Sequence, residues 1–138
     1  MSGFLIDANV ISELIKTAPA PQVAAWVNAT DAELIYISVI TLGEIRKGIS
    51  LLPQSKRRTR LEAWLGSDLL MRFAGRILDI DHEIADRWGQ LSGVRGYTLP
   101  VIDGLLAATA IHHNLTLVTR NTRDVARTGV ALFNPWSD

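Results

Sequence analysis

Short apolar runs that stop at a polar residue recur along the chain and are separated by stretches with helical periodicity. A continuous apolar run that ends in this way is typical of a buried strand in a parallel sheet. We expect strands at residues 4–6, 34–37, 76–80, 115–118 and 130–133. Because strands alternate with helices throughout, the pattern predicts an α/β fold whose central, mainly parallel sheet is covered by helices on both faces.

Apolar residues three and four positions apart predict helices between these strands. We place them at residues 8–16, 21–30, 39–51, 54–73, 82–94 and 101–113, and we expect residues 119–124 to form a polar loop. Asp7, Ser38 and Asp81 directly precede three of the helices, and both residue types are favoured N-caps. The helix at 101–113 is apolar nearly all round, which predicts that it is buried.

Composition narrows the class of protein. A chain of 138 residues, 48% of them hydrophobic, has enough apolar surface for a substantial core, and we expect residues 1–138 to form a single domain. The absence of cysteine excludes disulfides and thiolate metal sites and fits a reducing compartment. We find no signal peptide and no apolar run of membrane-spanning length, so we expect a cytoplasmic protein that does not enter a membrane. The formal net charge of zero disfavours a simple polycationic nucleic-acid binder.

Four acidic residues are expected at one edge of the sheet. Asp7 follows the first strand, Asp124 follows the fourth, and Glu44 and Asp103 lie near the starts of helices that open from the same edge. Carboxylates held together are destabilising unless a cation lies between them, and Mg²⁺ and Mn²⁺ are hard ions that prefer oxygen ligands. The pattern therefore predicts a Mg²⁺ or Mn²⁺ site, which would suit hydrolysis of a phosphodiester.

Each acid also has an ordinary structural interpretation. Asp7 could cap the helix that follows it, and Asp124 could cap a final turn. Glu44 could pair with a neighbouring basic residue, and Asp103 with an arginine. The convergence of all four on one edge of the sheet favours the functional interpretation.

Basic residues are concentrated in one part of this neutral chain. Residues 46–60 contain no acid and six basic residues, namely Arg46, Lys47, Lys56, Arg57, Arg58 and Arg60. This stretch could follow a polyanionic backbone near the acids, or it could be a solvated helix face. The histidines, His82, His112 and His113, lack metal-ligand spacing and are expected to be structural.

Four motifs, each containing one of the acids, occur in order along the chain. They are LIDAN at 5–9, continued by ISE at 11–13; TLGEIRKG at 41–48; PVIDGLLAATA at 100–110; and LVTRNTRD at 117–124. With these motifs in this order, the chain resembles the PIN-domain ribonucleases, specifically the VapC/FitB-like toxins of bacterial type II toxin–antitoxin pairs. The resemblance covers essentially the whole chain.

This resemblance implies a three-layer α/β/α fold with strand order 3-2-1-4-5, and Mg²⁺- or Mn²⁺-dependent endonucleolytic cleavage of RNA. By motif match, the metal-binding and catalytic acids would be Asp7, Glu44, Asp103 and Asp124, supported by Asn9, Thr119 and Asn121. Asp124 would help a second metal or orient the attacking water. Val125 replaces the phenylalanine that often follows the last acid in the family, and we interpret the difference as a packing change.

The resemblance also implies partners. Such toxins are similar in forming homodimers, in being silenced by a cognate antitoxin whose tail lies in a groove near the active site, and in assembling on DNA through that antitoxin. The apolar faces of the first, second and fourth helices are therefore expected to stay partly exposed without the partner. Substrate RNA would contact the basic stretch, through Arg46, Lys56, Arg57, Arg58 and Arg60.

Two other functions compete with this hypothesis. A receiver-like phosphoacceptor domain would need a second acid beside Asp7 and a lysine after the last strand, but Phe133 is followed by Asn134. A non-catalytic RNA- or protein-binding module on the same fold would not need the four acids.

Overall fold

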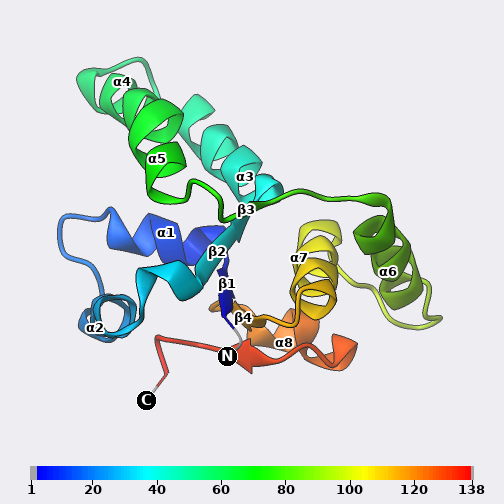
Figure 1. Ribbon diagram of the computed structural model, residues 1–138. Coiled ribbons are helices and arrows are strands. Elements are labelled where there is room, and N and C mark those ends of the chain that lie inside the picture. The colour runs from blue at the N-terminus through cyan, green and yellow to red at the C-terminus, as the bar shows by residue number, and fades with distance from the viewer. Residues whose placement is uncertain (1–2, 138) are drawn as a thin grey trace.

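The computed structural model describes residues 3–137, which are built around a five-stranded parallel sheet (Figure 1). The strands are β1 (Phe4–Ile6), β2 (Ile35–Ser38), β3 (Ile77–Leu78), β4 (Thr116–Val118) and β5 (Leu132–Phe133). Their order is β3-β2-β1-β4-β5, which confirms the expected 3-2-1-4-5 topology. β1 lies at the centre, so the residue that follows it is at the middle of the carboxyl edge.

Helices cover both faces of the sheet (Figure 1). They are α1 (Ala8–Leu14), α2 (Pro21–Ala29), α3 (Val39–Ser50), α4 (Lys56–Ala63), α5 (Leu70–Arg72), α6 (His82–Ser92), α7 (Val101–His112) and α8 (Thr122–Val125). Shorter segments are the 3₁₀ turns η1 (Ala32–Leu34) and η3 (Ala126–Thr128), and the π-helical segment η2 (Trp64–Leu69). Within residues 3–137, none of the helices has the length and apolar character needed to cross a bilayer.

Two hydrophobic clusters form the core, one on each face of the sheet. The period of two in β1 sends Ile6 into a cluster with residues of α1, α2, α3 and η2, while Leu5 joins a cluster with residues of α7, β4 and α8. Both side chains are almost completely buried. The three-layer α/β/α arrangement expected from the sequence is therefore confirmed.

The structure corrects the expected helix at 54–73. It begins at Lys56 and is α-helical only to Ala63, after which η2 interrupts it. The Ser67 hydroxyl donates to the Ala63 carbonyl at 3.0 Å, which is the carbonyl that the Ser67 amide would use in an α-helix. The hydroxyl thus competes with the main chain for this carbonyl at the point where the helix widens to a π turn. Leu65 and Leu69, both in the π-helical segment, are buried.

Other differences lie at the ends of elements. The stretch 119–124 is not all loop, because the Thr119 hydroxyl accepts the Asn121 amide at 3.1 Å in a turn that leads into α8. The expected strands at 76–80 and 130–133 are only two residues long. The buried helix is α7, but its first turn is open to solvent, with Val101 59% exposed.

A buried carboxylate fixes the corner between α1 and α2. Glu13 is 6% exposed, and its carboxylate accepts the Ala20 amide at 2.9 Å and the Lys16 ammonium at 3.0 Å. The Ala20 amide, followed by Lys16, lowers the pKa of Glu13 below its usual value. Glu13 therefore stabilises the fold in its ionised form.

We predict that Glu13→Gln lowers the Tm at pH 7. Because the folded pKa of Glu13 is depressed, its contribution is present above the unfolded value of 4.5 and is lost as the pH falls through the folded value. The difference in Tm between wild type and variant should therefore shrink at about pH 3. Thermal melts at both pH values, with the exposed Glu83→Gln as control, measure this; an equal difference at both would contradict it.

Candidate metal centre

Asp7 is the fixed point of the acidic edge. Its carboxylate caps α1 by accepting the Ala8 amide on Oδ1 at 2.7 Å, as one of the structural interpretations predicted. Its Oδ2 accepts the Thr119 hydroxyl at 2.8 Å. Asp7 is 6% exposed, and this burial raises its pKa although both hydrogen bonds lower it. Capping and participation in a site are therefore compatible, because Oδ2 faces the neighbouring strand end.

The three residues expected to support the acids lie around Asp7. The Asn9 amide donates to Asp7 Oδ2 at 3.4 Å and to Thr119 Oγ1 at 3.3 Å. The main-chain amide of Asn121 donates to the same hydroxyl, while the Asn121 side chain is exposed. The Asn9 Oδ1 atom is buried and has no hydrogen-bond partner. Asn9 and Thr119 therefore hold the Asp7 carboxylate directly, and Asn121 acts through Thr119.

Glu44 reaches the edge from the neighbouring strand. Ser38 ends β2 and caps α3 by accepting the Ile40 amide at 3.1 Å, which places Glu44 in the second turn of that helix. Its Oε1 atom is buried and has no hydrogen-bond partner. Desolvation, followed by the charges of Asp7 and Asp103, raises the pKa of Glu44 to about 7. The charge of Lys47 partly opposes this increase in pKa, but Glu44 forms no ion pair within residues 3–137 with a neighbouring basic residue, which was the alternative from the sequence.

Asp103 and Asp124 complete the set from the other face of the sheet. Asp103 lies in the first turn of α7 and is half-buried. Desolvation and the charges of Asp7 and Asp124 raise its pKa. Asp124 lies on α8 and is exposed, and its main-chain carbonyl accepts the Tyr97 hydroxyl at 3.0 Å. Among the described residues, Asp103 has no arginine partner.

The acids influence one another without meeting at one point. In this arrangement of residues 3–137, no three acidic or histidine side chains are gathered closely enough to hold a metal ion between them. The residues nevertheless fit a hard cation, because the donors are all carboxylate oxygens and one of them, Glu44 Oε1, is buried without a partner. The histidines stand apart from this group, at the start of α6 and at the end of α7 opposite to Asp103.

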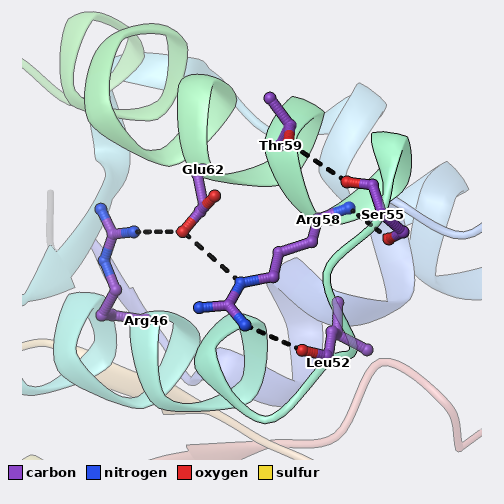
Figure 2. Close-up of polar contacts among 6 residues, drawn as sticks. All are labelled: Arg46, Leu52, Ser55, Arg58, Thr59 and Glu62. Atoms are coloured by element: carbon purple, nitrogen blue, oxygen red, sulfur yellow. Dashed lines mark hydrogen bonds and ion pairs between the residues drawn. The ribbon is translucent and has the colours of Figure 1, made fainter.

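The basic stretch is partly occupied by an ion-pair network (Figure 2). Glu62 Oε2 lies 3.6 Å from Arg58 Nε and 4.0 Å from Arg46 Nη1, which joins α4 to α3. The Arg58 guanidinium also donates to the Leu52 carbonyl at 3.0 Å. Arg46, although exposed, and Arg58 thus pair with an acid of the fold, whereas Lys56, Arg57 and Arg60 are exposed and form no ion pair within residues 3–137.

The sequence analysis gave no role to Arg120, Arg123 and Arg127. These arginines follow or flank Thr119 and Asp124 and are all exposed. The available signal was the occurrence of three arginines within residues 120–127, two of them in the last motif and one just after it.

The chain matches known proteins over nearly its full length. Residues 4–130 match the family model described as "PIN domain". The chain is 39% identical over 137 residues to the toxin FitB of Neisseria gonorrhoeae, covering 97% of this chain and 99% of that protein. It is 36% identical over 135 residues to a VapC ribonuclease of Sinorhizobium fredii, covering 96% of each. The solved structure of FitAB bound to a DNA fragment superposes with a TM-score of 0.91 at 37% identity, covering 98% of this chain and 96% of that one.

We predict that Glu44→Gln stabilises the metal-free protein at high pH. With a folded pKa of about 7 against an ordinary 4.5, Glu44 favours folding only while it is protonated, so that contribution is lost as the pH rises through 7. The Gln variant should therefore melt higher than wild type at about pH 8, with a smaller difference at about pH 5.

Thermal melts in EDTA measure this effect. Glu83→Gln, at an exposed position in the first turn of α6, serves as the control and should show no such gain. A Glu44→Gln variant that melts lower than wild type at high pH would show that the Glu44 carboxylate has a favourable partner.

Proposed function

The chain belongs to the PIN-domain family, and from this membership we propose that it is a divalent-metal-dependent endoribonuclease and the toxin of a type II toxin–antitoxin pair. The names of the relatives support this proposal, since one is called a toxin and another a ribonuclease. The reaction is hydrolysis of an RNA phosphodiester bond. We further propose that residues 1–138 form one domain and that the protein acts in the cytoplasm.

The observation that carries the proposal is the state of Glu44. A buried carboxylate oxygen without a partner is destabilising, and the charges of Asp7 and Asp103 increase the penalty. A bound Mg²⁺ or Mn²⁺ would remove it, because a cation favours the ionised form of all the surrounding acids. The arrangement thus lowers stability in a way that metal binding would offset.

Four acids of the chain would hold the metal. We assign the ligands as Asp7, Glu44 and Asp103, with Asp124 as the acid that orients the attacking water or helps a second ion. When bound, the ion supplies an ionised water, neutralises phosphate charge and stabilises the leaving oxygen. Asn9 and Thr119 keep Asp7 Oδ2 oriented, so that this carboxylate does not turn away when its neighbours are deprotonated.

An apolar groove is the proposed site of the antitoxin. It has a volume of about 270 Å³ and lies between α1, α2 and the continuous helix formed by η2 and α5. Ile11, Leu14 and Val27 line it, and Ile15 at its side is 45% exposed. This location agrees with the expectation that the helices expected at 8–16, 21–30 and 54–73 keep apolar surface open for a partner. We also propose a homodimer, and assembly with the antitoxin on DNA, as the solved structure of FitAB with a DNA fragment suggests.

The topology argues against a receiver domain. Receiver domains have strand order 2-1-3-4-5, whereas β1 here lies between β2 and β4. The non-catalytic binding module remains the competing function, and cleavage of RNA separates it from the nuclease.

We predict that the purified protein cleaves RNA with Mg²⁺ or Mn²⁺ and is inactive in EDTA. Asp103→Asn should lower the cleavage rate by at least roughly 100-fold, since loss of a group that only supports a metal ligand already costs 10–100-fold. The exposed Asp79→Asn is the matched control and should cleave normally. Full activity of the wild-type protein in EDTA would end the metal hypothesis.

Stability of Asp103→Asn distinguishes a site residue from a scaffold residue. Because Asp103 lies near like charges, its neutralisation should leave the metal-free protein equally or more stable. Added Mg²⁺ should raise the Tm of wild type more than that of the variant, since an ion bound only to the folded state stabilises it by mass action. A large loss of stability in EDTA would instead identify Asp103 as the partner of a buried cation.

A further inference from the structure

Two arginines in the segment that follows Thr119 lie on aromatic rings. The Arg120 Cζ atom is 5.1 Å from the centroid of the Trp136 ring, and the Arg127 Cζ atom is 4.3 Å from the centroid of the Tyr97 ring. Both arginines are exposed. Arg120 directly follows Thr119, and Arg127 lies in η3, the 3₁₀ turn that follows α8.

Both rings are themselves held in place by contacts with distant parts of the chain. The segment after β5 runs back towards α2 (Figure 1), where the Trp136 carbonyl accepts the Gln22 amide at 3.3 Å. Trp136 also packs against the core cluster that contains residues of α1, and its side chain helps to lower the pKa of Glu13. The Tyr97 hydroxyl donates to the Asp124 carbonyl at 3.0 Å. The two rings are therefore fixed relative to α1 and α8. Asp7 caps α1, and Asp124 lies on α8.

Contact with a ring leaves the guanidinium donors available. A cation–π contact uses no N–H group as a donor to a protein oxygen, and the five N–H groups of a guanidinium form a planar fork that matches two phosphate oxygens. Neither Arg120 nor Arg127 forms an ion pair within residues 3–137. Arg46 and Arg58 differ in this respect, because both form ion pairs with Glu62 (Figure 2).

We propose that Arg120 and Arg127 bind backbone phosphates of single-stranded RNA and position the strand across the acidic edge. This inference rests on the proposed ribonuclease function and assigns its substrate contacts. The adjoining carboxylates repel a polyanion, so an RNA strand that reaches them needs cations close by. A guanidinium already oriented by a ring loses less conformational freedom on binding than a free side chain does.

An acidic protein segment is the other polyanion that two arginines could bind. The structure favours RNA because Arg120 directly follows Thr119, whose hydroxyl donates to Asp7. Arg127 in turn lies on the Tyr97 ring, whose hydroxyl donates to the Asp124 carbonyl. The apolar groove proposed for the antitoxin lies elsewhere: residues of α1, α2, η2 and α5 line it, and neither Arg120 nor Arg127 is among them.

The test measures binding separately from cleavage. A fluorescent oligouridylate is titrated with protein in EDTA, and anisotropy gives Kd over a range of salt concentrations. Arg120→Ala and Arg127→Ala should each weaken binding about tenfold. Each should also reduce the slope of log K against log salt by about 0.7, the value for one phosphate contact on a single strand.

Two further variants separate charge from geometry. Arg120→Lys keeps the charge but loses the planar fork, so it should retain the salt slope and recover only part of the affinity. Arg87→Ala removes an exposed arginine on α6 and should change neither quantity. Circular dichroism melts confirm that each variant is folded at the assay temperature.

Several outcomes would overturn the inference. It fails if wild type binds and cleaves RNA while both alanine variants bind with unchanged affinity and slope, a result that leaves the proposed function intact. It fails also if wild type does not bind the oligonucleotide, or if the variants lose binding of poly-L-glutamate but not of RNA. A wild type that binds through these arginines yet cleaves no RNA with Mg²⁺ or Mn²⁺ would contradict the proposed function alone.

Discussion

The burial of the Asp7 carboxylate at the centre of the sheet edge is the constraint on which the rest of the site depends. β1 is only three residues long, and Asp7 follows it directly. One oxygen of the Asp7 carboxylate caps α1, and the other accepts a hydrogen bond from Thr119, the residue after β4. The Thr119 hydroxyl and the Asn9 amide hold that oxygen, which fixes the relation between the first and fourth strands at their carboxyl ends. The geometry of the edge therefore follows from satisfying one buried charge.

Repulsion among the acids then gives the edge its chemical character. Glu44 and Asp103 come from opposite faces of the sheet, and each feels the charge of Asp7. Within residues 3–137 neither acid forms an ion pair, although the charge of Lys47 acts on Glu44, and Arg46 and Arg58 pair with Glu62 instead. Negative charge at the edge is thus left for a ligand to neutralise, while positive charge is available around α8 to receive a polyanion.

Much of the fold was predictable because it depends on local patterns. Short apolar runs gave the strands, and N-cap residues such as Ser38 gave the starts of helices. The order of the strands came from the resemblance to a known family, since periodicity does not report which strands pair. The π-helical segment and α8 were missed because both depend on hydrogen bonds of single hydroxyl groups, at Ser67 and Thr119.

The candidate acids could be named from the sequence, whereas their protonation and hydrogen bonding could not. The spacing of the four acids brought them to one edge, yet only the three-dimensional structure shows that Glu44 Oε1 lacks a partner and that the acids do not converge. The engagement of Arg58 and the ring contacts of Arg120 and Arg127 join residues that the sequence does not relate. Such contacts arise from tertiary packing, which a local pattern does not encode.

Direct measurement of metal binding tests the central claim most closely. Electron paramagnetic resonance of free Mn²⁺, recorded during titration with the protein, reports binding without substrate or activity. We expect saturable binding by wild type, competition by Mg²⁺, and a large loss of affinity in Asp7→Asn, with Asp79→Asn unchanged. A wild-type protein that binds no more Mn²⁺ than the Asp7→Asn variant would contradict it.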